Sequence, residues 1–168
     1  QTKKYEDGYS LAKKAMDLGF DPYGVGDIKN ACVANIVQNY VNDKNFAAAN
    51  AYADKVLAIE PNGFNYDIKG FVVEQEKGIN EAAELFKKSM ELGFGNGVFD
   101  YGRFLFTKAQ NFIDANPNKT NKELAPELVP MLKEAAQVLE QAKELAPDTS
   151  AASILDQINY QLEVLEAK

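Results

Sequence analysis

The sequence contains few side chains of the kinds that enzymes use for catalysis. Histidine is absent from its 168 residues, which removes the commonest general base and the commonest metal ligand. A serine, threonine or cysteine nucleophile would then need a carboxylate or a lysine to activate it. Glu81 and Glu84 form an acidic pair, but their spacing places them on the solvated face of a predicted helix. We therefore expect a protein that is not an enzyme, with no metal site and no cofactor.

Aromatic and charged side chains at helical spacing are better suited to binding a protein segment. Phe99, Arg103 and Phe106 share one face of a predicted helix, which has a second apolar face beginning at Val98. Packing requires only one apolar face, so the other is a candidate binding surface. A guanidinium can pair bidentately with a carboxylate and stack on aromatic rings, which makes Arg103, the only arginine, the leading contact residue. Two earlier helices continue this aromatic stripe, whose full set is Gln38, Phe64, Asp67, Phe71, Glu74, Phe99, Arg103 and Phe106.

Composition narrows the class of partner. The formal net charge is −7, whereas binding to a nucleic-acid backbone needs clustered lysine and arginine. Hydrophobic residues make up 46% and charged residues 26% of the chain, as in ordinary globular proteins. No apolar run approaches the roughly 18 residues of a membrane span. The expected partner is thus a protein or peptide.

The only cysteine and the first residue of the chain both give information about the cellular compartment of the protein. Cys32 is the only cysteine, so it cannot form an internal disulfide, and we expect it to be a small apolar residue in a helix. The first residue is Gln1 rather than methionine, followed by a polar Thr-Lys-Lys. This start is typical of bacterial exported proteins after signal cleavage, although a shortened sequence explains it as well. An exported or periplasmic location is favoured over the cytoplasm.

A similar helical segment occurs three times and ends each time at a proline or glycine. The copies are Asn45–Asn62, Asn80–Gly93 and Lys133–Pro147. In each copy, small residues recur seven positions apart on one helix face, where they let a neighbouring helix approach closely. We therefore expect each copy to be one half of a helical hairpin. The small residues are Ala49 and Val56, Ala82 and Ser89, and Ala135 and Ala142.

With the helices that precede them, these segments resemble tetratricopeptide repeats. That family's unit of about 34 residues has W-x2-L-G-x2-Y in its first helix and A-x3-F…P in its second. The chain has no tryptophan, and Val37 and Lys69 depart from the pattern, so the repeats are degenerate. The matching residues are Ile36, Tyr40, Ala49 and Pro61 in the first unit, Tyr66, Gly70, Ala82 and Phe86 in the second, and Tyr101, Gly102, Ala135, Leu139 and Pro147 in the third.

The resemblance implies an all-α fold, a right-handed α-solenoid of stacked antiparallel helix pairs with a C-terminal capping helix. In this family the second stripe of each first helix faces a concave groove that binds extended or helical peptides. The aromatic stripe would line that groove, with Phe71 near Phe99, Arg103 and Phe106. Family members that clamp a terminal carboxylate use lysine and asparagine on this surface, and the residues found here suit that task poorly.

The whole chain, residues 1–168, is expected to be a single domain. The third repeat is longer than the others because of an insertion at about 115–130. The expected parts are an incomplete repeat at 1–22, repeats at 27–61, 63–94 and 97–147, and a capping helix at 149–167.

The insertion contains residues that predict where a helix begins and where it bends or ends. Thr120 and Glu123 predict a capping box at the start of a helix, and Pro126 and Pro130 predict a kink in that helix or its division in two. Residues 116–131 are long enough to fold into the groove and cover the aromatic stripe, so an open groove and a filled one both remain possible.

The function that these patterns favour is non-catalytic protein binding or scaffolding. One alternative is a self-associating structural module that uses the aromatic stripe as an oligomer interface. Another is a carrier of a small molecule or lipid in the same groove. A monomer is favoured over an oligomer.

Overall fold

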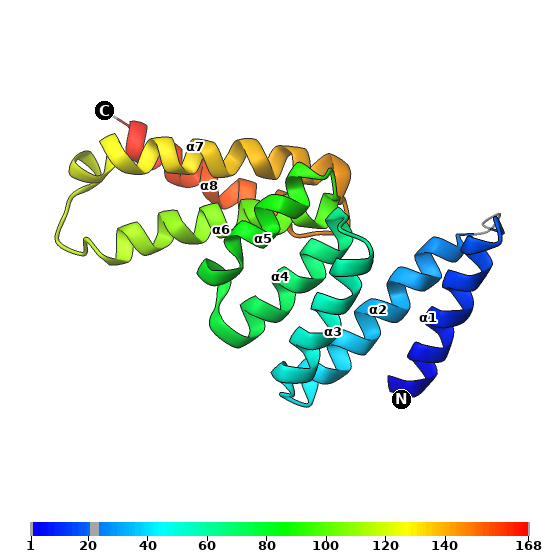
Figure 1. Ribbon diagram of the computed structural model, residues 1–168. Coiled ribbons are helices and arrows are strands. Elements are labelled where there is room, and N and C mark those ends of the chain that lie inside the picture. The colour runs from blue at the N-terminus through cyan, green and yellow to red at the C-terminus, as the bar shows by residue number, and fades with distance from the viewer. Residues whose placement is uncertain (1, 21–23, 168) are drawn as a thin grey trace. The chain divides into compact units, whose positions relative to one another are not determined.

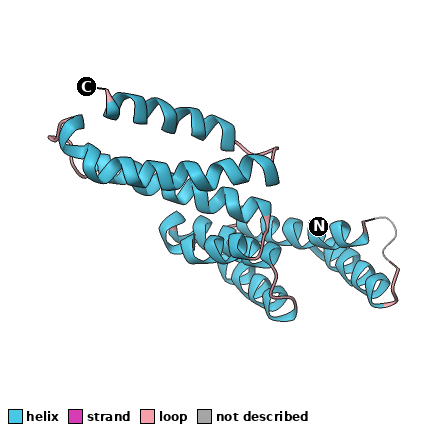
Figure 2. Cartoon of the chain, turned by 90° about the horizontal axis from the view of Figure 1, so that it is seen from above, coloured by secondary structure: helices cyan, strands magenta, loops and turns pink. Residues whose placement is uncertain are grey.

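The computed structural model describes residues 2–20 and 24–167. Within these ranges it contains eight α-helices and no strand (Figures 1 and 2), so the all-α prediction is confirmed. None of these helices has both the length and the apolar character that a membrane span requires. The helices are α1 (Thr2–Asp17), α2 (Val25–Asn42), α3 (Phe46–Ile59), α4 (Gly63–Lys77), α5 (Ile79–Glu91), α6 (Gly95–Asp114), α7 (Asn121–Leu145) and α8 (Ala151–Glu166).

The chain forms two compact units, residues 1–82 and residues 83–168, which we call the N-terminal and C-terminal units. In the N-terminal unit, α1 packs on α2, and α3 packs on both α2 and α4. In the C-terminal unit, α7 packs on both α6 and α8. Helices that follow one another in the sequence therefore lie side by side within each unit, as helical pairs do.

The core of the N-terminal unit is built from one face of each of three helices. Small and β-branched residues predominate in it, because they allow the helices to approach closely. Ala49 and Ala53 are fully buried. The core residues are Val33, Val37 and Val41 of α2, Ala49, Ala53 and Val56 of α3, and Ile68 and Val72 of α4.

Three of the described helices end in Schellman motifs. At the end of α1, the Gly19 N–H donates to the Met16 carbonyl at 2.8 Å, and the Phe20 N–H donates to the Ala15 carbonyl at 2.9 Å. Gly19 has φ 75°, the left-handed conformation that this motif needs. Gly93 repeats this arrangement after α5, with φ 78°.

The third motif, at the end of α2, has a lysine where glycine is usual. Lys44 has φ 55°, and its N–H donates to the Val41 carbonyl at 2.9 Å. The Asn45 N–H donates to the Tyr40 carbonyl at 2.8 Å. Asn45 then begins the next helix, because its side chain accepts a hydrogen bond from the Ala48 N–H.

Close helix approach in the C-terminal unit depends on the small residues that the repeats contain. Ala135, Ala142 and Ser89 are all fully buried. A Cβ added at Gly102 of α6 would lie 2.8 Å from Cγ of Leu139 on α7, closer than side-chain carbons normally approach. Glycine at 102 therefore lets α6 and α7 pack at short range.

Of the two outcomes that the prolines predict, a kink or a division into two helices, the division does not occur. Residues 121–145 form one helix, α7, with Pro126 and Pro130 inside it, drawn as one continuous ribbon in Figure 1. Both prolines are exposed, whereas Leu124 and Leu128 on the opposite side are buried in the core of the unit. Burial of these leucines offsets the loss of the two helical hydrogen bonds.

The start of α7 has the predicted capping residues. The Glu123 carboxylate accepts a hydrogen bond from the Thr120 N–H at 2.8 Å and another from the Thr120 hydroxyl at 2.8 Å. Hydrogen bonds from Thr120 to this carboxylate lower the Glu123 pKa. At the other end of the unit, Ile154, Leu155 and Ile158 bury one face of α8 against the core.

Candidate functional site

The C-terminal half of the aromatic stripe lies along α6. Phe99 and Phe106 are half-buried and pack against the core of the C-terminal unit. Arg103 lies between them in the sequence, four residues after Phe99 and three before Phe106, so all three share a helix face as predicted. Each ring is therefore partly exposed to solvent, while the remainder is held by the core.

Arg103 is held in place by an acidic neighbour on the same helix. Its Nη2 lies 2.8 Å from Oδ1 of Asp100, and its Nε lies 3.2 Å from the same oxygen. The two side chains are 30% and 20% exposed, so the pair is partly screened from water. This contact orients the guanidinium while leaving part of it accessible, which is a suitable state for a binding residue.

The N-terminal half of the stripe lies on α4 and α2. Phe64 and Phe71 are half-buried and pack against the core of the N-terminal unit. Asp67 and Glu74 are also half-buried. Gln38 is exposed on α2, and its amide donates to the Asn42 side chain at 2.8 Å, within the same helix.

The structure thus places the predicted stripe residues on the expected helices, and each unit contains two of its four phenylalanines. The proximity of Phe71 to Phe99, Arg103 and Phe106 involves both units, and it stays a prediction. The insertion does not form a separate flap, because its leucines belong to α7. Whether the aromatic stripe is open to a ligand also stays a prediction.

Sequence reasoning missed a polar cluster between α3 and α4. The Lys69 ammonium donates to Oδ1 of Asn50 at 2.7 Å and lies 2.8 Å from Oδ1 of Asp54. The amide of Asn50 donates to the Glu76 carboxylate at 2.9 Å. These polar partners explain why position 69 can be a lysine, a residue that departs from the repeat pattern. A signal was present in the sequence, since a lysine in a half-buried helix position requires an acidic partner.

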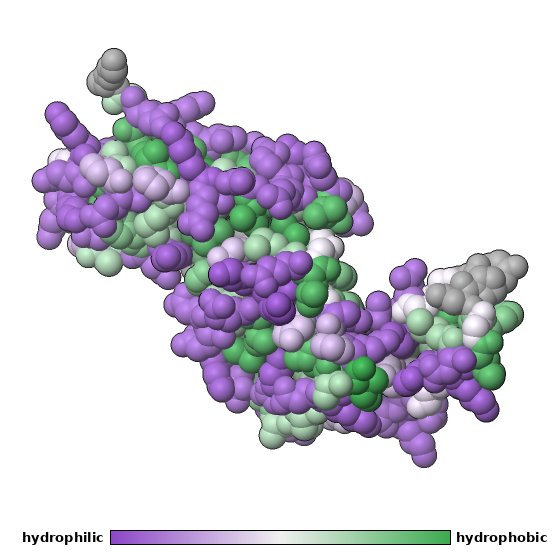
Figure 3. Space-filling view, turned by 45° about the horizontal axis from the view of Figure 1, so that its top comes forward, coloured by the Kyte–Doolittle hydropathy of each residue, from purple (hydrophilic) through white to green (hydrophobic). Residues whose placement is uncertain are grey.

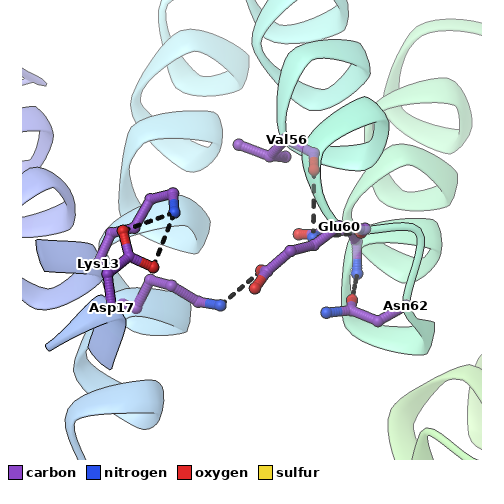
Figure 4. A network of polar contacts seen from close by, with 7 residues as sticks. Lys13, Asp17, Val56, Glu60 and Asn62 are labelled. Atoms are coloured by element: carbon purple, nitrogen blue, oxygen red, sulfur yellow. Dashed lines mark hydrogen bonds and ion pairs between the residues drawn. The ribbon is translucent and has the colours of Figure 1, made fainter. Parts of the chain in front are cut away.

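A buried lysine ties α2 to the end of α3. The Lys29 side chain is only 8% exposed and pairs with the Glu60 carboxylate. Figure 4 shows Glu60 extending toward this partner, beside the ion pair of Lys13 with Asp17 on α1. The Glu60 carbonyl also accepts a hydrogen bond from the Asn65 amide at 2.8 Å, which joins the start of α4 to this corner.

The C-terminal unit also contains a groove that the sequence did not indicate. It has a volume of about 780 Å³ and lies between the first half of α7 and the last turn of α8. We call it the α7–α8 groove. On the face drawn in Figure 3, hydrophobic residues lie at the surface among hydrophilic ones. The lining residues are Asn121, Lys122, Ala125, Pro126, Val129, Pro130, Val164, Leu165, Glu166 and Ala167.

Catalytic groupings are not evident in the described part of the chain. Glu81 and Glu84 are exposed, as expected for surface carboxylates. Burial raises the pKa of the Tyr52 and Tyr101 hydroxyls above the ordinary tyrosine value, which makes both less available as bases. Among the described residues, no group of three or more metal-ligating side chains is clustered.

No protein-family model matches the chain, and no curated protein matches it.

Proposed function

We propose that this chain is a non-catalytic protein-binding module built from degenerate tetratricopeptide-like repeats. In this proposal its paired helices continue as a right-handed α-solenoid, and the aromatic stripe binds a peptide or protein segment. The observation that carries the proposal is the arrangement on α6, where Asp100 holds Arg103 between two half-buried phenylalanines on one helix face.

The chemistry of that arrangement suits a peptide partner. Arginine beside aromatic residues is a common composition of interface hot spots. The exposed part of the guanidinium can donate hydrogen bonds to a carboxylate or backbone carbonyl of the partner, and the phenylalanine rings offer apolar contact area. We infer that the preferred segment is acidic or rich in accessible carbonyl groups, with an apolar side chain near the acidic one.

The experiment starts with the immobilised chain, which captures partners from an extract of its source organism. The affinity of the captured partner is then measured for the wild type and for Arg103→Ala. We expect the substitution to weaken binding by about 30-fold, or roughly 2 kcal/mol, and to leave the melting temperature nearly unchanged. Phe71→Ala and Phe106→Ala are expected to weaken binding as well.

Matched controls are available on α6. Lys108→Ala removes a cation from an exposed position off the stripe, and Phe112→Ala removes a half-buried ring that packs on the same core. Both are expected to retain the wild-type affinity. If Arg103→Ala binds as well as the wild type, the stripe is not the binding surface. If the wild type is a discrete dimer that Phe106→Ala dissociates, the stripe is an oligomer interface instead.

A further inference from the structure

Helix α1 has the sequence of the second helix of a repeat. Its last residues, Lys13–Phe20, closely repeat Lys87–Phe94 at the end of α5, and both helices end at a glycine with positive φ. This alignment makes Ala15 equivalent to Ser89, one of the small residues of the repeated segments. Two sets of equivalent positions follow, four residues apart on one helix face. They are Ala15, Val56, Ser89 and Ala142, and Leu11, Tyr52, Leu85 and Val138.

In the later copies this face is covered, and α7 shows by what. A Cβ added at Gly102 of α6 would lie 3.3 Å from Cγ1 of Val138. The first helix of that pair therefore lies against the position that Leu11 has in α1. Val138 is half-buried and Ala142 is fully buried. In the other two copies, Tyr52 and Leu85 are half-buried, and Val56 and Ser89 are buried.

The same face of α1 lacks this cover. Among the described residues α1 packs on α2 alone, and Figure 1 shows it at the edge of the N-terminal unit. Leu11 is 69% exposed, and Ala15 is only half-buried. Phe20 is 59% exposed, whereas its equivalent Phe94 is half-buried. We call Leu11, Ala15 and Phe20 the open face of α1.

A hollow lies at the other end of α1. It has a volume of about 370 Å³ and is lined by Thr2 at the start of α1 and by Asn39, Asn42 and Asp43 at the end of α2. A first helix runs antiparallel to its second helix, as α6 does to α7 in Figure 1. A first helix docked on α1 would therefore end near Thr2. The last carbonyls of a helix lack partners within it, and asparagine amides can donate to them.

We propose that the open face of α1 binds an amphipathic helix of a partner protein, in the place that α6 takes on α7. The model for this partner is α6 itself, in which Val98, Gly102 and Leu105 lie on one buried face. The partner helix needs apolar residues seven apart with a small residue between them, so that it can approach α1 closely. Its C-terminal end lies at the hollow near Thr2. This surface is separate from the aromatic stripe, so the two proposals stand or fall independently.

A synthetic peptide with the sequence of α6, residues 95–114, serves as the probe. A control peptide has glutamine in place of Val98 and Leu105. Both are titrated into the whole chain, and NMR follows the methyl groups of Leu11, Ala15 and Val138. We expect the α6 peptide to shift the Leu11 and Ala15 signals with a dissociation constant on the order of 100 μM, and the control peptide to leave them unchanged. Equal binding of the two peptides, or shifts at Val138 without shifts at Leu11, would overturn the proposal.

Matched leucine variants separate this face from a merely sticky surface. Leu11→Gln changes a largely exposed side chain, so it should leave the melting temperature nearly unchanged and weaken peptide binding about tenfold. Leu145→Gln is the control, because Leu145 is 58% exposed on another helix and should not affect binding. Unchanged affinity in Leu11→Gln, or an equal loss in both variants, would show that the open face is not the site. The residues equivalent to Leu145 are Leu18, Ile59 and Leu92, which are exposed in every copy.

The direction of the docked helix gives a further test. A nitroxide label at the C-terminus of the peptide should broaden the amide signals of Thr2, Asn42 and Asp43, whereas a label at its N-terminus should not. The reverse pattern would overturn the proposed placement.

A second copy of the chain is the competing occupant of the open face. Sedimentation without peptide, over the concentrations used for NMR, should show a monomer. A dimer that Leu11→Gln dissociates would mean that a second copy covers α1, and the proposal of a partner helix would fail. Arg103→Ala is the remote control and should bind the α6 peptide as the wild type does.

Discussion

Ser89 and Gly97 lie so close together that residue 97 has no room for a side chain. A Cβ added at Gly97 would come within 2.0 Å of the Ser89 hydroxyl oxygen and 2.5 Å of its Cβ. The added atom would also lie 3.0 Å from the Ser89 carbonyl carbon, which belongs to the backbone of α5. This pair therefore sets the distance between α5 and the first turn of α6.

Gly97→Ala should destabilise the protein for this reason. We expect a loss of about 3 kcal/mol in the free energy of unfolding, because the helices must move apart, although alanine itself favours helix by about 1 kcal/mol. Urea denaturation measures the difference. Asn96→Ala, at the exposed neighbouring position, is the control and should change stability little. Combining Gly97→Ala with Ser89→Gly should recover part of the loss, and no recovery would contradict this explanation.

Lys44→Gly should stabilise the protein. Lys44 adopts φ 55°, a left-handed conformation that costs a residue with a Cβ about 1 kcal/mol and costs glycine almost nothing. We expect a gain of about 0.5–1 kcal/mol in urea denaturation, reduced somewhat by the larger entropy of glycine in the unfolded chain. Asp43→Gly is the matched control, because Asp43 has φ −78° and gains nothing from glycine. A stabilised Asp43→Gly would rule out the conformational argument.

Glu123 should titrate below the ordinary glutamate value of 4.5. Its lowered pKa means that its contribution to stability is fully present above that value and is lost as the pH falls through the lower, folded-state pKa. Carboxyl-carbon NMR gives the pKa directly. Thr120→Ala removes the hydroxyl donor but keeps the backbone N–H, so it should move the Glu123 pKa only part of the way back. A pKa at or above 4.5 in the wild type would contradict the observed cap.

Arg103→Ala and Phe106→Ala should differ in their effect on stability. The Arg103 pair with Asp100 joins residues three apart on one partly exposed helix face, and such a pair contributes about 0–1 kcal/mol. Phe106 is half-buried against the core, so its truncation should cost about 2 kcal/mol. Thermal melts of both variants distinguish these values. A loss of several kcal/mol in Arg103→Ala would show that Arg103 is a structural residue rather than a binding one.

Much of the secondary structure could be predicted because its causes are local. Gly19 and Gly93 mark helix ends through a backbone conformation that glycine adopts easily, and the hydrogen bonds that define each motif join residues within one turn. The periodicity of apolar residues placed Phe99, Arg103 and Phe106 on one face of α6 without knowledge of any neighbouring helix. The capping residues of α7 are likewise only three positions apart.

Tertiary packing decided the features that depend on residues far apart in the chain. The local rule for proline predicts a kink or a division in residues 121–145, and burial of Leu124 and Leu128 keeps α7 a single helix. Lys69 looks misplaced until Asn50 and Asp54 of α3 are seen beside it. The α7–α8 groove exists only because the last turn of α8 lies opposite Pro126 and Pro130, some forty residues earlier in the chain. Periodicity along one helix identifies the face that is apolar, whereas the partner of that face is set by the sum of many long-range contacts.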